Sequence, residues 1–153
     1  DQIAGCDAIA IPGGESTTIS RLIDKNGMRA PLETFDGGIF ATCAGMVLMA
    51  EEVDDPRVRP LGLMDMTVLR NAFGRQRESF EADLDVAGLD RPFHAIFIRA
   101  PLASRVGGDA QPMASIERGA VAVRQGRHMA FSFHPKLGGD LRLHRLFLNG
   151  LVG

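Results

Sequence analysis

Short apolar runs alternate with helical patterns along this chain. The run at 7–11 ends at a Pro-Gly-Gly turn, and a segment opened by Ser16 then carries apolar residues at the helical positions 19, 22 and 23. Further apolar runs, each short enough for one buried strand, are 39–41, 95–98, 121–123 and 129–133. This alternation predicts an α/β fold.

Weaker signals complete the predicted order of elements. Short helices are expected at 31–35 and 46–50, and two strands between 64 and 86. Residues 80, 82, 84 and 86 are apolar in strict alternation, which predicts a strand with one wet face. Gln125-Gly126-Arg127 is a plausible hairpin turn, and Asp140 caps a last helix whose apolar face is formed by 143, 146 and 147.

Composition limits the class of protein. The 153 residues are 45% hydrophobic and 24% charged, with a net charge of -2, so neither a disordered chain nor a basic nucleic-acid or membrane surface is expected. No apolar run approaches the roughly 20 residues of a membrane span. Two distant cysteines make no disulfide framework. We therefore expect a single cytoplasmic domain over 1–153, incomplete at its amino end because Asp1 falls inside a helix-to-strand connection.

Cys43 is the sharpest candidate for chemistry. It lies where a strand turns directly into a helix, between the small residues Ala41 and Gly45. Small neighbours permit the tight turn of a nucleophile elbow, which exposes the side chain. A helix N-terminus lowers the pKa of a thiol, and the free N–H of Ala44 is placed to receive an oxyanion. The alternative is an inert cysteine that fills the core.

A thiolate needs a proton partner, and His134 is the best candidate. It ends the strand at 129–133, and in an α/β sheet functional residues collect at the carboxyl ends of strands. His94 and His128 are most simply packing or surface residues, and His144 is expected to be solvated on the last helix. Cys43 and His134 are therefore expected to meet.

Two further strand ends supply polar groups. In the loop Pro12–Ser16, Gly14 can bring a second N–H to a substrate oxygen, although the loop is also explained as a turn with a helix cap. Arg70 can hold a carboxylate through a two-pronged contact, although any one arginine of this arginine-rich chain is more simply a surface charge.

Six segments carry a resemblance to a known family. They are, in chain order, 12–18 (PGGESTT), 42–45 (TCAG), 70–76 (RNAFGRQ), 79–82 (SFEA), 97–101 (FIRAP) and 132–135 (SFHP). Together they resemble the glutaminase subunits of pyridoxal 5'-phosphate synthases, which are class I glutamine amidotransferases. The elbow and the His-Pro pair would fit any class I amidotransferase, whereas RNAFGRQ and FIRAP indicate this subfamily.

The resemblance implies a flavodoxin-like, three-layer domain that hydrolyses L-glutamine to glutamate and ammonia. Cys43 would attack the side-chain amide, His134 would move the protons, and the N–H groups of Gly14 and Ala44 would hold the oxyanion. Ammonia would pass to a barrel-shaped synthase subunit, and the glutaminase itself would need no metal or cofactor. The residues implied around bound glutamine are Gly14, Glu15, Ser16, Arg70, Ile98 and Arg99.

Three departures from the family pattern qualify this expectation. Lys136 stands where the family has the Glu of a Cys-His-Glu triad, and an ammonium cannot stabilise the imidazolium, so impaired activity is expected. The family's opening strand and helix precede the segment that starts at Asp1. Ala41 stands where the elbow usually has Gly, and its methyl group is expected to add some strain.

Two other functions remain open from the sequence. Lys136 and the expected missing opening segment favour a catalytically weak docking or regulatory subunit of the same synthase. A cysteine hydrolase or redox sensor on a flavodoxin-like sheet would use Cys43 without glutamine, but it leaves RNAFGRQ and FIRAP unexplained.

Overall fold

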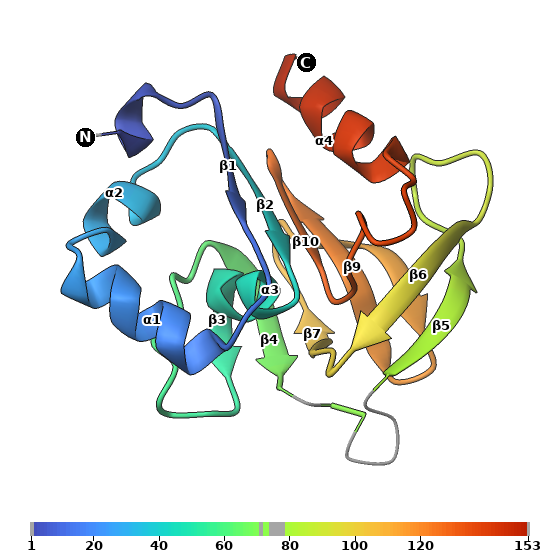
Figure 1. Ribbon diagram of the computed structural model, residues 1–153, viewed down its shortest axis with the longest axis horizontal. Helices are drawn as coiled ribbons and strands as arrows, with labels where there is room; N and C mark the ends of the chain where they lie inside the picture. Colours follow the sequence, from blue (N-terminus) through green and yellow to red (C-terminus); the bar gives the residue numbers. More distant parts are fainter. Residues whose placement is uncertain (1, 71, 74–78, 153) are drawn as a thin grey trace.

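A twisted sheet of eight strands forms the centre of the computed structural model, which describes residues 2–70, 72–73 and 79–152 (Figure 1). Seven strands follow the order β1-β2-β10-β9-β7-β4-β3, and β8 pairs with β9 beside this path. Their bounds are β1 Ala8–Ile11, β2 Gly38–Thr42, β3 Ala50–Val53, β4 Met64–Leu69, β7 Leu102–Val106, β8 Gln111–Ile116, β9 Gly119–Gln125 and β10 His128–Phe131.

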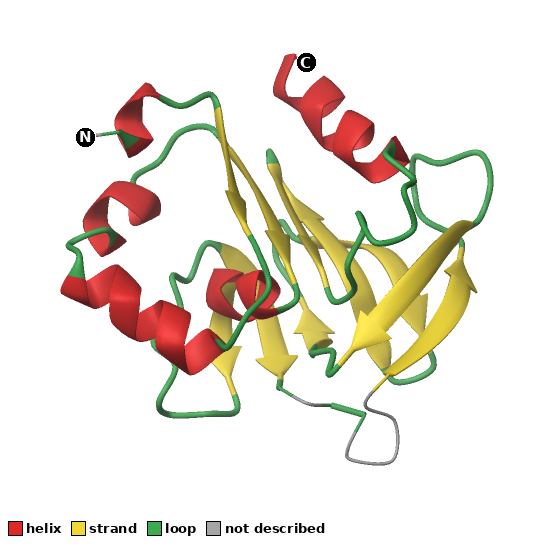
Figure 2. Ribbon diagram, viewed as in Figure 1, coloured by secondary structure: helices red, strands yellow, loops and turns green. Residues whose placement is uncertain are grey.

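Helices cover one face of this sheet, and a helix with a hairpin covers the other, which makes three layers (Figure 2). On the first face lie α1 (Ser16–Lys25), α2 (Arg29–Glu33) and α3 (Ala44–Met49), preceded by the 3₁₀ turn η1 (Ile3–Gly5). On the second face lie α4 (Arg142–Val152) and the antiparallel pair β5 (Ser79–Leu84) and β6 (Phe93–Ile98). The predicted α/β class is confirmed.

Aromatic packing fastens the second layer to the sheet. Phe97 of β6 stacks on Phe80 of β5 with ring centroids 4.5 Å apart, and it meets Phe133 edge-on at 5.5 Å. Phe40 of β2 packs against Phe147 of α4 at 5.2 Å. Since a buried aromatic side chain contributes roughly 2–3 kcal/mol, these contacts hold β6 and α4 firmly against the strands that lead to the candidate site.

Parallel pairing brings several strand ends to one edge of the sheet. β1 pairs with β2, and β2 with β10, all in parallel. Figure 1 shows the arrowheads of β1, β2, β4 and β6 pointing toward the lower part of the view. The segments that follow these strands are therefore close in space although they are distant in the sequence.

Most predicted elements are present, with some corrections. The hairpin at Gly126 is confirmed, since β9 and β10 pair antiparallel with Gln125 opposite His128. The expected solvation of His144 is wrong, because its ring stacks on Phe40 at 4.8 Å. The apolar face predicted for the first helix is wrong at Leu22, which is 48% exposed. Strands β3, β7 and β8 were not predicted.

Candidate active site at the strand ends

Cys43 occupies a strained turn between β2 and α3. Its φ of 53° and ψ of -110° lie outside the regions that a side chain normally allows, and its N–H donates to the carbonyl of Phe131 at 2.8 Å. A Cβ at Gly45 would lie 2.3 Å from the carbonyl oxygen of Ile11. The elbow therefore needs glycine at 45, whereas Ala41 sits fully buried in the extended strand β2 with no positive φ.

The Cys43 thiol is sheltered and protonated in the resting chain. Cys43 is 8% exposed, and its Sγ donates to the carbonyl of Ile98 at 3.8 Å. Burial raises the pKa of the thiol, and the backbone N–H of Ala44 opposes this only in part. The prediction that the helix N-terminus lowers the pKa of this thiol is thus wrong for the resting chain, because desolvation is the larger effect. Ionisation requires a nearby base.

His134 is the candidate for that base. Its backbone N–H donates to the carbonyl of Ile96 at 3.1 Å, which anchors the segment after β10 against β6. A Cβ at Gly13 would lie 3.1 Å from His134 Cε1 and 3.4 Å from Cys43 Cβ, so both side chains border the same small volume. Burial, followed by the charge of Lys136, lowers the pKa of His134. At neutral pH the imidazole is therefore uncharged and able to accept a proton.

Lys136 acts on His134 by charge alone. It lies exposed in the turn that follows His134 and forms no ion pair within the described part of the chain. A carboxylate partner would stabilise the imidazolium that forms when His134 takes the thiol proton, and an ammonium destabilises it. The charge of Lys136 thus disfavours a protonated His134.

The loop after β1 borders the same volume and starts α1. Gly14 has φ 144°, which favours glycine, and Ser16 is the buried first residue of α1. The helix cap is Glu15, whose carboxylate accepts hydrogen bonds from the backbone N–H groups of Thr17 and Thr18, both at 3.0 Å. The Thr17 hydroxyl also donates to this carboxylate, and this bond, followed by the backbone N–H bonds, lowers the pKa of Glu15 to about 2. Glu15 is therefore a fixed anion at the rim of the site.

Arg70 follows β4 and reaches this rim. Its Nη2 lies 3.0 Å from Glu15 Oε1, and its Nη1 forms an ion pair with Asp55 Oδ2. Asp55 lies in the loop between β3 and β4 and was not identified from the sequence. Of the motif at 70–76, positions 71 and 74–76 lie outside the described residues.

The end of β6 completes the site. Ile98 is 41% exposed and offers its carbonyl to the Cys43 thiol, and Arg99 has a positive φ of 46°. A non-glycine residue in that conformation costs roughly 1–3 kcal/mol and is common at functional sites. The structure thus gathers the sequence-predicted positions at one edge of the eight-stranded sheet and at the adjoining end of β6: Gly14, Glu15, Ser16, Cys43, Ala44, Arg70, Ile98, Arg99, His134 and Lys136.

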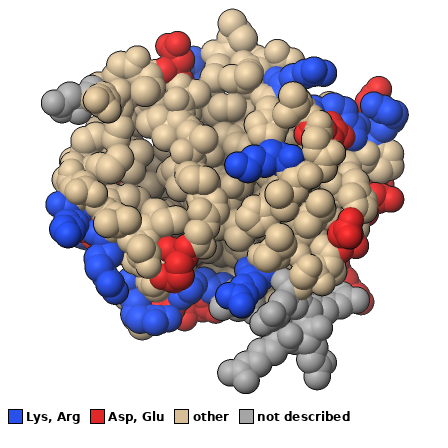
Figure 3. Space-filling view, in the orientation of Figure 1, with Lys and Arg blue, Asp and Glu red and all other residues tan. Residues whose placement is uncertain are grey.

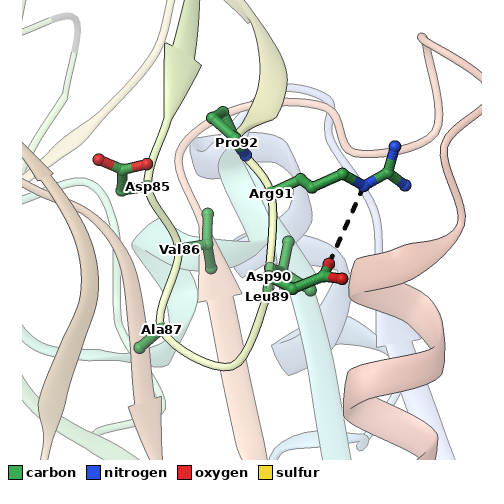
Figure 4. Close-up of a pocket in the computed structure, with 7 residues that line it drawn as sticks. All are labelled: Asp85, Val86, Ala87, Leu89, Asp90, Arg91 and Pro92. Atoms are coloured by element: carbon green, nitrogen blue, oxygen red, sulfur yellow. Dashed lines mark ion pairs between the residues drawn. The ribbon is translucent and has the colours of Figure 1, made fainter.

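A separate cavity of about 240 Å³ lies in the loop between β5 and β6 (Figure 4). The residues that line it are Asp85, Val86, Ala87, Leu89, Asp90, Arg91 and Pro92. None of these residues belongs to the site at the strand ends. Arg91 and Asp90 form a loose ion pair of 4.0 Å, and both are largely exposed.

Metal ligands and membrane spans were sought among the described residues. They contain no group of three His, Cys, Asp or Glu side chains arranged to hold a metal ion. They also contain no helix of the length and apolar character needed to cross a membrane.

A three-layer α/β fold with a cysteine elbow near a histidine is the arrangement expected of class I amidotransferases. The family model described as the SNO glutamine amidotransferase family matches residues 1–153, and the chain belongs to this family. A solved structure titled as a glutamine amidotransferase superposes with a TM-score of 0.91 at 44% identity, covering 97% of this chain and 81% of that one.

Two curated relatives share most of this sequence, and each is described as a pyridoxal 5'-phosphate synthase subunit PdxT. The protein from Methanosphaerula palustris is 71% identical over 150 residues, which cover 98% of this chain and 77% of that protein. The protein from Methanoculleus marisnigri is 65% identical over 151 residues, covering 99% and 79%. The resemblance found in the sequence is confirmed.

Proposed function

We propose that this chain hydrolyses L-glutamine to glutamate and ammonia, with Cys43 as nucleophile and His134 as general base and acid. The observation that carries the proposal is the strained turn at Cys43 beside the uncharged ring of His134, with Gly13 against both. Membership of a glutamine amidotransferase family supports it.

The reaction begins with proton transfer from the Cys43 thiol to His134. The thiolate attacks the side-chain amide carbon of glutamine, and the N–H groups of Gly14 and Ala44 receive the developing oxyanion. The protonated His134 then gives its proton to the amide nitrogen, the C–N bond breaks, and ammonia leaves a glutamyl thioester on Cys43. Water, deprotonated by His134, attacks the thioester and releases glutamate and the thiol. These steps use only side chains, backbone N–H groups and water.

Glutamine is bound by residues at the rim of the site beside Cys43. Arg70 offers a cation to the α-carboxylate, and Glu15 offers a fixed anion to the α-ammonium group. Ser16, Ile98 and Arg99 form the remaining wall. A free amino acid, which carries both charges, fits this pair better than an amide within a peptide.

The ammonia acceptor in this proposal is a barrel-shaped synthase subunit that makes pyridoxal 5'-phosphate. The names of the relatives, which are synthase subunits, support this partner. Nucleic acid and membrane have no part in the proposed reaction, and its proposed place is the cytoplasm, where a thiol stays reduced.

Lys136 favours a second candidate function, a catalytically weak subunit that docks on the synthase and regulates it. Lys136 lowers the pKa of His134, which disfavours the imidazolium needed in the first step. We rank this second because the turn at Cys43, the ring of His134 and the ion pair of Arg70 support hydrolysis.

An electrophilic glutamine analogue, a chloroketone with the α-amino and α-carboxylate groups intact, tests the proposal. It should alkylate buried Cys43, and glutamine should protect against it, while exposed Cys6 should remain unmodified. Iodoacetamide, which lacks the amino acid groups, should prefer Cys6. Mass spectrometry of the digested chain reads both sites. Equal modification of the two cysteines by the analogue, or no protection by glutamine, would contradict a glutamine site at Cys43.

A further inference from the structure

Three carboxylates hold Arg70 in place. The Arg70 backbone N–H donates to Asp54 Oδ1 at 2.9 Å, while its guanidinium meets Asp55 through Nη1 and Glu15 through Nη2. The first two partners belong to the loop between β3 and β4, and Glu15 caps α1. A single arginine thus joins this loop to the start of α1. Figure 3 shows basic and acidic side chains side by side along the lower left margin, over α1 and this loop.

From this arrangement we infer that Asp55 is a positioning residue, which fixes the Arg70 guanidinium so that it faces the α-carboxylate of bound glutamine. The inference rests on the proposed function and extends it to a residue outside the glutamine contacts. Asp55 does not touch the substrate in this account and acts only through Arg70.

Burial separates the roles of the two carboxylates on the guanidinium. The side chains of Asp55 and Arg70 are 14% and 18% exposed, whereas that of Glu15 is 51% exposed. An ion pair sheltered from water is less screened than an exposed one, and it loses more when one partner is removed. The Asp55–Arg70 pair is therefore the persistent one, and the Glu15–Arg70 pair is the one that opens at lower cost.

Each carboxylate is also prepared for its role by other donors. Glu15 keeps the N–H groups of Thr17 and Thr18 when Arg70 turns away, so it loses no essential partner. Asp55 Oδ1 accepts from the backbone N–H of Arg57 at 2.9 Å, which fixes the carboxylate before glutamine arrives. The Arg57 side chain, although 71% exposed, helps to hold the same carboxylate, with Nε 3.0 Å from Oδ1 and Nη2 2.6 Å from Oδ2.

The consequence is a guanidinium with one edge committed to the protein and one edge available. With Nη1 held by Asp55, Nη2 can pass from Glu15 to the glutamine α-carboxylate, and Glu15 becomes free to meet the α-ammonium group. Without Asp55, both edges of Arg70 would turn to Glu15 or to solvent, and the carboxylate site would no longer be formed in advance.

Asp55→Asn tests this inference, with Asp65→Asn as the matched control. Asp65 also pairs with an arginine, Arg105, at 2.8 Å. It lies near the start of β4, at the end of the strand away from Arg70. The measurement is the rate of Cys43 alkylation by the chloroketone analogue as a function of its concentration, on the full chain with its synthase partner.

In Asp55→Asn, the concentration for half-maximal rate should rise about tenfold, while the maximal rate stays within about twofold, because the loss is in binding and not in thiol chemistry. The rate of Cys43 modification by iodoacetamide should be unchanged, whereas a general loosening of the site would change it. Asp55→Glu, which restores the charge, should recover most of the affinity, and Asp65→Asn should behave as the unaltered chain.

Two results would overturn the inference. If the analogue alkylates Cys43 normally in both Asp55→Asn and the control, Asp55 does not position Arg70. If Asp55→Asn fails to fold, Asp55→Glu is measured in its place. A folded Asp55→Glu protein that is as stable as Asp65→Asn but binds the analogue tenfold more weakly would also contradict a role for the charge. Failure of the unaltered chain to react saturably would instead contradict the proposed function itself, and the inference with it.

Discussion

At the scale of single residues, the nucleophile turn depends on a missing side chain. The small residue at 45 allows α3 to start directly beneath the end of β1, with the Ile11 carbonyl in the place a Cβ would take. Because that obstacle is backbone in the sheet, it cannot rotate away as a side chain would. The strain at Cys43 is therefore maintained by packing around Gly45.

Gly45→Ala should lower the free energy of unfolding by about 2–3 kcal/mol and slow alkylation of Cys43, because β1 and α3 must separate to admit the methyl group. Urea unfolding measures the first effect. Gly138→Ala is the control, since nothing lies within 4 Å of its Cβ position, and it should change stability by less than about 0.5 kcal/mol. Equal stability of the two variants would show that the elbow does not need glycine at 45.

The candidate site was predictable from the sequence only where the signal is local. Cys43 and His134 were recognised because each follows a strand, and Gly45 because small residues mark a tight turn. Asp55 was not, because its partner Arg70 lies 15 positions away and is reached only when the loop between β3 and β4 folds back. The raised pKa of Cys43 was also missed, since it depends on burial by elements far away in the sequence.

At the scale of elements, β2 and β10 are joined by a side chain as well as by backbone pairing. His128, the first residue of β10, accepts a hydrogen bond at Nδ1 from the Ile39 N–H at 3.1 Å. Burial lowers the pKa of His128. Protonation would turn the acceptor into a donor facing another donor, at the start of the strand that leads to Cys43.

This gives a pH dependence with a definite sign. Because the pKa of His128 is lower in the folded chain than in the unfolded one, the unfolded chain binds the extra proton first, and stability falls as pH drops below about 6.5. His128→Asn, which keeps an acceptor but does not titrate, should lose less stability between about pH 7.5 and about pH 5.5, by at most about 1.4 kcal/mol per pH unit. Urea unfolding at both pH values measures the difference. An equal loss of stability in both proteins would show that protonation of His128 does not cause the pH dependence. His134, whose pKa is also lowered, contributes equally to both proteins, so its effect cancels in the comparison.

The elements missed by the sequence analysis share a physical cause. β3 follows α3 without an intervening Gly or Pro, and its two glutamates are exposed, so nothing separated it from the helical pattern. In β8 only Met113 and Ala114 are buried, and Pro112 lies within it, since this strand pairs only with β9 outside the main path. Periodicity in the sequence identifies strands that bury every second side chain on one face. β3 and β8 do not follow that pattern.

At the scale of the whole molecule, the site exists because the eight-stranded sheet and the β5–β6 pair packed on it bring five strand ends together. The loop after β1, the elbow after β2, and the segments after β4, β6 and β10 each supply at least one group, from Gly14 to Lys136. The layers around them exclude water from Cys43 while leaving His134 partly accessible. Lys136 is the one member of this set whose charge works against the proposed chemistry.

Glutamate release from glutamine, with the synthase partner present, tests the central claim most directly. The unaltered chain should release glutamate slowly, and Cys43→Ala not at all. Lys136→Glu should be faster, by up to about 10⁴-fold, because a carboxylate raises the pKa of His134 and stabilises its imidazolium. Lys25→Glu, at the other lysine of the chain, should have no effect on the rate. A folded Lys136→Glu protein that releases no glutamate, or a Cys43→Ala protein that still does, would contradict this account.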